Sequence, residues 1–275
     1  MCTAASYTTK DHYFGRNLDL ELSYNETVTI TPRGYTFPFR HIAPCTSHYA
    51  MIGIATVADN YPLYYDAVNE KGLAMAGLNF PVNADYKPVA EGKTNIASFE
   101  FIQWILATCD SVAQAREAIA GMNLTDTRFS DAFPLSTLHW LLSDRNESIV
   151  VESVKDGIHV YHNPVGVMTN NPPFDKQLFS LNDYAKVTGV SNPPSTFAGH
   201  NTYEESKDFA LDAYSRGMGS DGLPGGMSSM ERFVKVAFVK LNSYNRKQKG
   251  LPVKDNTEIY DEKHSVSQFF HILHA

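Results

Sequence analysis

The sequence is poor in cysteine, with three in 275 residues, namely Cys2, Cys45 and Cys109. The count is odd and the spacings are wide, which excludes a disulfide framework and a CxxC metal site. The sequence also lacks an apolar stretch long enough for a membrane-spanning helix, and its N-terminus has no basic segment followed by an apolar one. We therefore predict a cytoplasmic protein that does not act at a membrane.

Clusters of positive charge are missing too. The chain has 23 Lys and Arg against 30 Asp and Glu, for a net charge of −7, and no basic run stands out. Nucleic acid and anionic membranes are therefore not expected as partners.

Cofactor signals are equally scarce. Residues 217–222 match GxGxxG, but "LPGG" follows where a dinucleotide site needs a helix. The close pairs His159/His162 and His271/His274 have no acidic or cysteine partner at ligand spacing. We expect no metal and no cofactor.

Apolar residues make up 43% of the chain, enough to bury a large core. No linker or internal repeat divides the chain, so we predict a single domain over residues 1–275. Short runs rich in β-branched and aromatic residues predict strands within 2–80 and again within 138–171. Between them, apolar residues at spacings of three and four predict helices over 99–109 and 112–122.

Two sequence patterns predict where helices begin. Ser111 with Gln114, and Ser228 with Glu231, both read as capping boxes, and a last helical pattern covers 265–275. Strands followed by helices and then strands again indicate antiparallel sheets covered by helices, an α+β fold, rather than alternating βαβ units.

The position of Cys2 raises a chemical question. If Met1 is removed, Cys2 carries both a thiol nucleophile and a free α-amine, which places a nucleophile and a base on one residue. A hairpin around residues 10–12 would return Arg16 towards Cys2, where a guanidinium favours the thiolate form of a thiol. Taken singly, Cys2 is as readily an accidental cysteine, and Arg16 with Asp19 a surface ion pair of little energetic weight.

Cys2 stands at the head of a series of motifs that run in order to the last residue. They are "FGRNLD", "VTITPRGY", "NEKGLAMAGLNF", "LHWLLSD", "VGVMTNNPPFD", "YSRGMG" and "SSMERF". Read together, these motifs resemble the choloylglycine hydrolases, which include the bile salt hydrolases and penicillin V acylases of gut bacteria. The resemblance implies the fold of N-terminal nucleophile hydrolases, an αββα sandwich of two antiparallel sheets between helical layers.

The resemblance also implies roles for individual residues. The nucleophile would be exposed by loss of Met1, an arginine would tune its thiol, an aspartate would hold its α-amine, two asparagines would form the oxyanion hole, and a second arginine would complete the site. Without the resemblance, the asparagines are ordinary turn residues and the second arginine is a solvated helix residue. In that order, the residues are Cys2, Arg16, Asp19, Asn79, Asn170 and Arg232.

The implied activity is cleavage of the amide bond of glycine- or taurine-conjugated bile salts through a thioester on Cys2. The steroid needs an apolar pocket, and each candidate lining residue is equally plausible in the core. Penicillin V acylase is the alternative, although the family's acylases tend to carry tyrosine where this chain has Asn79. The pocket candidates are Tyr24, Ile54, Phe80, Phe133 and Leu135.

Two departures from the family pattern bear on activity and assembly. The family continues past "FFHIL" with further β-structure, whereas this chain ends at "HILHA", so we expect it to lack C-terminal strands. An inactive truncated homologue is therefore an alternative of another class. Relatives usually carry an acidic residue in place of Gly226, in a loop used for assembly, so a homotetramer or a homodimer remains open.

Overall fold

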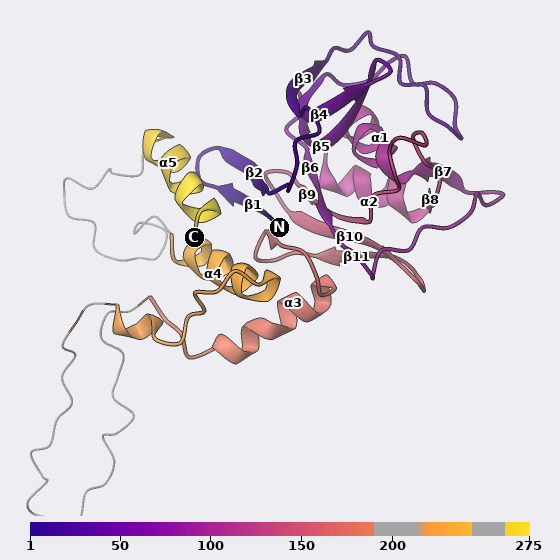
Figure 1. The fold of residues 1–275 in the computed structure, drawn as a ribbon. Coiled ribbons are helices and arrows are strands. Elements are labelled where there is room, and N and C mark those ends of the chain that lie inside the picture. The colour runs from indigo at the N-terminus through magenta and orange to yellow at the C-terminus, as the bar shows by residue number, and fades with distance from the viewer. Residues whose placement is uncertain (190–214, 216, 244–261) are drawn as a thin grey trace, which may run out of the picture.

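The computed structural model describes residues 1–189, 215, 217–243 and 262–275. Its main element is a seven-stranded antiparallel sheet in the order β11-β10-β9-β6-β5-β4-β3, and a three-stranded antiparallel sheet has the order β12-β1-β2 (Figure 1). A short parallel pair, β7-β8, is separate from both. The strands are β1 (Cys2–Thr8), β2 (His12–Leu18), β3 (Thr27–Thr31), β4 (Met51–Ala58), β5 (Tyr61–Asn69), β6 (Ala74–Asn79), β7 (Thr94–Ala97), β8 (Met122–Thr125), β9 (Leu138–Ser143), β10 (Ser148–Val154), β11 (Gly157–His162) and β12 (Val167–Met168).

Helices lie on both outer sides of the paired sheets. Helix α1 contacts β5 and β6 of the large sheet, whereas α4 and α5 contact β1 of the small one (Figure 1). The predicted α+β sandwich of two antiparallel sheets between helical layers is confirmed. The helices are α1 (Phe101–Thr108), α2 (Val112–Ala120), α3 (Phe174–Ser180), α4 (Ser229–Asn242) and α5 (Glu262–Leu273).

The large sheet separates two apolar cores. Leu141 and Leu142 are neighbours on β9, are both fully buried, and belong to different cores because successive side chains on a strand point to opposite faces. Leu142 packs in the core shared with α1 and α2, and Leu141 packs in the core shared with β1, β12, α4 and α5. Cys2 belongs to the second core, so the small sheet and its helices fix its position.

The predicted hairpin at the N-terminus is present. Strands β1 and β2 pair with Cys2 opposite Leu18 and Ala4 opposite Arg16, and the turn is closed by a hydrogen bond from Thr9 N to Asp11 O of 2.8 Å. Residues two apart on a strand share a face, so this register brings Arg16 to the same face and end of the hairpin as Cys2.

The two capping boxes turn out differently. At the start of α4, the Ser228 side chain accepts from Glu231 N and the Glu231 carboxylate accepts from Ser228 N, as predicted. At the start of α2, the Ser111 side chain accepts from Gln114 N, but the Gln114 side chain accepts from Asp110 N instead. Only half of that second box forms, because the Gln114 side chain reaches one residue further back.

Candidate active site

Arg16 holds the thiol of Cys2 directly. Its Nη2 donates to Cys2 Sγ at 2.7 Å, and its Nη1 donates to the carbonyls of Gly77 at 2.7 Å and Tyr65 at 3.3 Å. Cys2 is 4% exposed, so the guanidinium and the sulfur meet in a largely dry environment. A cation at this distance stabilises the thiolate form of a thiol.

The main-chain surroundings of Cys2 are equally defined. Cys2 N donates to Asn170 Oδ1 at 2.9 Å, which ties the start of β1 to the segment that follows β12. The Met1 amine donates to Asp19 O at 3.1 Å, and Asp19 N donates to Met1 O at 3.2 Å. Asp19 therefore lies beside the Met1–Cys2 bond, at the place where an α-amine of Cys2 would be exposed.

Arg232 joins Cys2 to Asn170 from the first turn of α4. Its Nη2 donates to Asn170 Oδ1 at 2.8 Å, and its Nη1 donates to Thr3 Oγ1 at 2.7 Å and to the carbonyl of Cys2. Burial lowers the pKa of the Arg232 guanidinium, and the nearby Cys2 and Asp19 partly offset that effect. The capped start of α4 is what places this side chain.

The two asparagines are linked as well. Asn170 Nδ2 donates to Asn79 O at 2.7 Å, and Asn79 Oδ1 accepts from Thr137 Oγ1 at 3.4 Å. A side-chain amide carries two N–H groups. Asn170 uses one of them on Asn79, and none of the described residues accepts from Asn79 Nδ2, so both amides have N–H groups available to an oxyanion.

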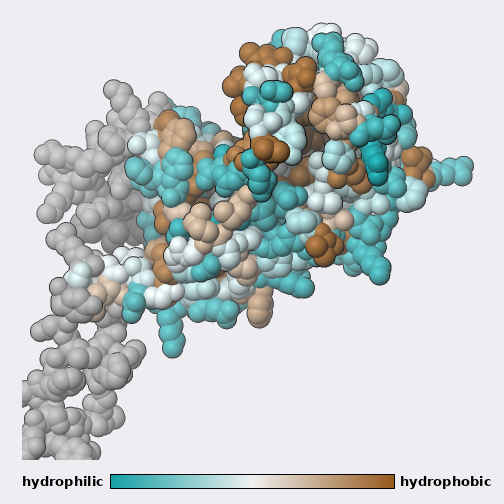
Figure 2. Space-filling view, viewed as in Figure 1, coloured by the Kyte–Doolittle hydropathy of each residue, from teal (hydrophilic) through white to brown (hydrophobic). Residues whose placement is uncertain are grey.

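All six predicted catalytic residues line one cavity of about 740 Å³. Of the predicted pocket residues, Tyr24, Phe133 and Leu135 also line it. Exposed apolar side chains gather over β3 and β4, in the brown area at the top of Figure 2, but they are not part of the cavity lining. The lining itself combines apolar side chains such as Leu63, Phe99 and Phe129 with the polar groups around Cys2.

Ile54 and Phe80 do not line this cavity. Ile54 lies opposite Val28 in the β3–β4 register, and directly opposed residues share a face. Val28 is 65% exposed, so Ile54 lies on the outer face of the sheet. A register shift after Ile54 turns Thr56 towards the cavity instead.

Phe80 is a core residue in this structure. It is fully buried, and its ring is stacked on His139 with 4.2 Å between ring centroids and 3° between planes. Its neighbour Asn79 is exposed to the cavity, and the alternation along the chain turns Phe80 away from it.

The loop that carries Asn170 has supports that the sequence analysis missed. The ring nitrogens of His139 contact Glu152 Oε1 at 2.9 Å and Thr169 O at 2.8 Å, and both side chains are almost fully buried. Gln177 Nε2 donates to the carbonyls of Asn170 and Pro172. The available signal was a polar residue inside an otherwise apolar run, "LHWLL" for His139.

A search of the described ranges finds no helix long and apolar enough to cross a membrane. Over the same residues, no group of three or more His, Cys, Asp or Glu side chains is placed to hold a metal ion.

Comparison with known proteins gives consistent matches. The model of a family described as linear amide C–N hydrolases, choloylglycine hydrolase family, matches residues 2–275. A bile salt hydrolase/transferase of Lactiplantibacillus plantarum is 52% identical, with 99% of this chain and 78% of the relative covered. A bile salt hydrolase/transferase of Clostridium perfringens is 38% identical over the same shares.

Solved structures agree with the sequence matches. The C2A mutant of the conjugated bile acid hydrolase from Clostridium perfringens superposes with a TM-score of 0.83 at 36% identity, covering 100% of this chain and 78% of that one. Penicillin V acylase from Agrobacterium tumefaciens shares the fold, with a TM-score of 0.66 at 22% identity over 99% of this chain and 71% of that one. The chain therefore belongs to the choloylglycine hydrolase family and is a linear amide C–N hydrolase.

Proposed function

We propose that this enzyme hydrolyses the amide bond of glycine- or taurine-conjugated bile salts with Cys2 as its nucleophile. The observation that carries the proposal is the contact of 2.7 Å between Arg16 Nη2 and Cys2 Sγ in the lining of a cavity of about 740 Å³. Two relatives that match 99% of this chain are named bile salt hydrolase/transferase.

The first step is removal of Met1, which converts the amide nitrogen of Cys2 into an α-amine. Asn170 Oδ1 already accepts from this nitrogen at 2.9 Å, and Asp19 lies beside the bond that is cut. Both can hold and orient the amine, so that a base is fixed next to the sulfur.

The thiolate of Cys2 then attacks the amide carbonyl carbon of the substrate. A C–S bond forms and the carbonyl electron pair moves to oxygen, where the side-chain N–H groups of Asn79 and Asn170 stabilise the negative charge. Loss of one such donor typically costs about 10²–10³ in rate. When the tetrahedral intermediate collapses, the C–N bond breaks and the leaving glycine or taurine nitrogen takes a proton from the Cys2 ammonium.

Water completes the cycle. The neutral Cys2 amine takes a proton from a water molecule, whose oxygen attacks the thioester, and cleavage of the C–S bond releases the bile acid and regenerates the thiolate. If another amine attacks the thioester in place of water, the product is a new amide, which is a transferase reaction.

The cavity wall suits a steroid. Phe99, Phe129 and Phe133 form a series of edge-to-face contacts, with ring centroids 5.4 Å and 5.6 Å apart, and all three line the cavity. Rigid aromatic side chains offer a large apolar surface to a flat ligand. Ligand cavities commonly have volumes of about 300–1,000 Å³, so this cavity has the size of a whole-molecule site.

The test combines mass and activity. Intact-mass spectrometry should find the chain without Met1, and glycocholate and taurocholate should be hydrolysed faster than penicillin V. Cys2→Ser should abolish hydrolysis because a hydroxyl is far less ionised than a thiol, and none of the histidines in the described residues lines the cavity to act as a base. Cys45→Ser is the matched control and should keep full activity. Faster turnover of penicillin V, or an active Cys2→Ser variant, would overturn the proposal.

We also propose that the enzyme assembles with copies of itself. Strand β3 is an edge of the large sheet, and its Val28 and Ile30 are 65% and 68% exposed, next to Ile52 at 43%. An exposed apolar edge strand invites pairing with another chain. Light scattering after size-exclusion chromatography distinguishes a homodimer or homotetramer from a monomer, and Ile30→Lys should shift the distribution towards the monomer.

A further inference from the structure

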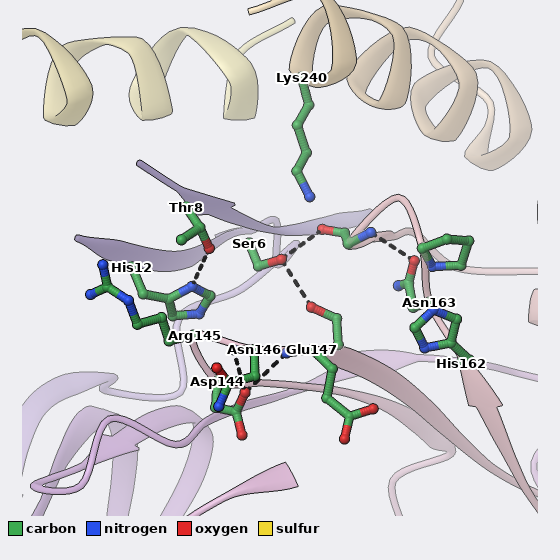
Figure 3. A pocket seen from close by; sticks show the side chains of 13 residues that line it. Ser6, Thr8, His12, Asp144, Arg145, Asn146, Glu147, His162, Asn163 and Lys240 are labelled. Carbon is green, nitrogen blue, oxygen red and sulfur yellow. Dashed lines mark hydrogen bonds between the residues drawn. The ribbon is translucent and has the colours of Figure 1, made fainter. Parts of the chain in front are cut away.

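A second cavity of about 290 Å³ lies away from Cys2, towards the other end of β1. Four parts of the chain form it: strand β1 with the start of β2, the turn between β9 and β10, the turn after β11, and the second half of α4 (Figure 3). Its lining is almost entirely polar, and none of the residues assigned above to the reaction contributes to it.

Lys240 is the lining residue that α4 contributes to this cavity. Its side chain extends from α4 towards Ser6, as Figure 3 shows. Its ammonium donates to the carbonyl of Val165, and none of the carboxylates in the described residues forms an ion pair with it. Lys240 is half-buried, and charges withdrawn from water in proteins are normally paired. Among the described residues, the Lys240 ammonium therefore has no anionic partner, although such a charge would normally have one.

The two carboxylates of the lining do not supply that partner. Asp144 accepts hydrogen bonds from the main-chain N–H groups of Val112, Asn146 and Glu147, at 2.7, 2.7 and 3.0 Å. Glu147 pairs with Arg116 at 3.0 Å. Asp144 is held by main-chain donors and Glu147 is paired with Arg116, and neither forms an ion pair with Lys240 among the described residues.

Gly166 provides the space beside Lys240. Its φ is +58°, in the left-handed region that glycine adopts without strain. A Cβ at this position would lie 2.3 Å from Lys240 Nζ and 2.4 Å from Ser6 Oγ. The Lys240 ammonium and the Ser6 hydroxyl therefore both lie next to Gly166. Any side chain at this position would clash with both groups, so only glycine fits here.

A chain of hydroxyl groups continues from Ser6 across the cavity. Ser6 Oγ contacts Ser148 Oγ at 3.0 Å, Ser148 Oγ contacts Ser143 Oγ at 2.8 Å, and Ser143 Oγ contacts His12 Nε2 at 3.2 Å. Thr8 Oγ1 holds the other ring nitrogen of His12 at 2.8 Å. Ser6 Oγ also donates to Gly166 O, at a long 3.5 Å. Hydroxyl hydrogens rotate to suit their partners, so Ser6 can turn its donor from this contact towards a ligand beside Lys240.

We propose that this cavity is a binding site for a small oxyanion of the size of phosphate, sulfate or a short carboxylate. Lys240 supplies the charge, and Ser6, at the end of the hydroxyl chain, supplies a neutral donor. The ligand chemistry follows from an ammonium without a counter-ion, hydroxyl donors that can reorient, and lining carboxylates that are already compensated.

The electrostatics of the cavity agree with this assignment. Burial lowers the pKa of Lys240 to about 8. His12 and Arg145 also line the cavity, and burial is the largest cause that lowers the pKa of His12. A bound anion would attract the ammonium and would thereby favour the charged form of Lys240.

Isothermal titration calorimetry of the whole enzyme tests the proposal, with inorganic phosphate, sulfate and acetate added separately at constant ionic strength. Saturable binding of one anion identifies the ligand class. Lys240→Met should weaken that binding about tenfold or more, since a hydrogen bond to a charged group is worth about 1.5–3 kcal/mol. Lys235→Met is the matched control, because Lys235 is on the same helix but outside the cavity lining.

Folding and catalysis of the variants are checked in parallel. Replacing a half-buried cation that has no counter-ion by an apolar side chain of similar length should not destabilise the chain, and bile-salt hydrolysis should be unchanged in both variants. Ser6→Ala is a second probe and should also weaken binding. The proposal is overturned if no anion binds saturably at constant ionic strength, or if Lys240→Met binds as tightly as Lys235→Met.

Discussion

Arg16 and Lys240 are both positively charged side chains, but their surroundings differ. Arg16 is a cation whose partner is on the chain, since its guanidinium lies 2.7 Å from Cys2 Sγ and is fixed by two carbonyls. Lys240 is a cation whose only described partner is a carbonyl. The planar fork of arginine suits a fixed contact with a single sulfur, whereas the compact ammonium of lysine suits a ligand that comes and goes.

Arg16→Lys keeps the charge and removes the fork. Lysine cannot reach the sulfur and both carbonyls at once, and a hydrogen bond to a charged group is worth about 1.5–3 kcal/mol. We expect kcat/KM to fall about 10- to 100-fold, with only a small change in the melting temperature. Steady-state kinetics and a thermal melt measure both quantities. An Arg16→Leu variant with full activity would show that Arg16 does not act on the thiol.

Lys240 should leave a signature in the pH dependence of stability. Burial lowers its pKa from the ordinary value of 10.5 to about 8. Between these values the unfolded chain holds a proton that the folded chain has released, so this group makes the free energy of unfolding rise as the pH rises from about 8 to about 10.5. Burial is the main cause that lowers the pKa of His12 below its ordinary value of 6.5, and Lys240 is one of the charges that lower it further. Lys240→Met removes the effect of that charge, but His12 nevertheless titrates below pH 8 in both proteins and does not contribute over this range.

The measurement is urea unfolding of wild type and Lys240→Met at pH 8 and pH 10. The variant should be more stable relative to wild type at pH 8 than at pH 10. A constant difference between the two proteins at both pH values would mean that Lys240 is protonated equally in the folded and unfolded chains.

At the scale of elements, local patterns and long-range contacts differ in how far the sequence predicts them. The β1–β2 hairpin follows from adjacent strands and a short turn, and it brings Arg16 to Cys2. The α4 capping box follows from Ser228 and Glu231. The prediction that Ile54 lines the cavity is wrong, because no sequence pattern indicates the register shift that follows Ile54 in β4. That shift depends on how β4 pairs with β5, which no local pattern encodes.

Contacts between distant segments could not be predicted without the family resemblance. Asn170 contacts Arg232, which is 62 positions away, and Cys2, which is 168 positions away. These contacts form because α4, β12 and β1 pack together. His139 and Glu152 are thirteen residues apart and pair across the buried face of the sheet. Side-chain identity alone indicated neither their contact nor their contact with Thr169.

The pair formed by His139 and Glu152 is expected to position the Asn170 loop. Glu152→Ala leaves a buried imidazole without its carboxylate, which should cost about 3–5 kcal/mol of stability. The double variant His139→Phe with Glu152→Met fills the same space with apolar groups, retains the stacking on Phe80 and should recover much of that loss.

The expected result in the double variant is a separation of stability from rate. Thr169 O loses its donor from His139, so the neighbouring Asn170 is held less firmly and kcat should stay low while KM changes little. Urea unfolding and steady-state kinetics on the three proteins measure this. If the double variant regains wild-type kcat along with stability, the pair supports the fold and does not position Asn170.

The whole molecule depends on one large sheet with a core on each face. The core containing Cys2 includes residues from β1, β6, β9, β10, α4 and α5, whereas the other core lies under α1 and α2. Because the same strands contribute to both cores, neither core can lose its packing without disturbing the sheet that the other needs. We therefore expect a single cooperative unfolding unit in which only one core packs against Cys2, whereas the other supports cavity residues such as Phe99 and Phe129.

Leu141→Ala and Leu142→Ala test this expectation, because the two variants differ only in which core loses a side chain. The two leucines are adjacent on β9, are identical in side chain and are both 0% exposed, but they face opposite cores. Truncation of either to alanine should cost about 2–5 kcal/mol, and circular dichroism and tryptophan fluorescence should report the same urea transition in each variant. Only Leu141→Ala should also lower kcat, because the cavity it leaves is in the core that holds Cys2. Two separate transitions would contradict the single unit, and an equal loss of kcat in both variants would contradict the coupling of one core alone to the nucleophile.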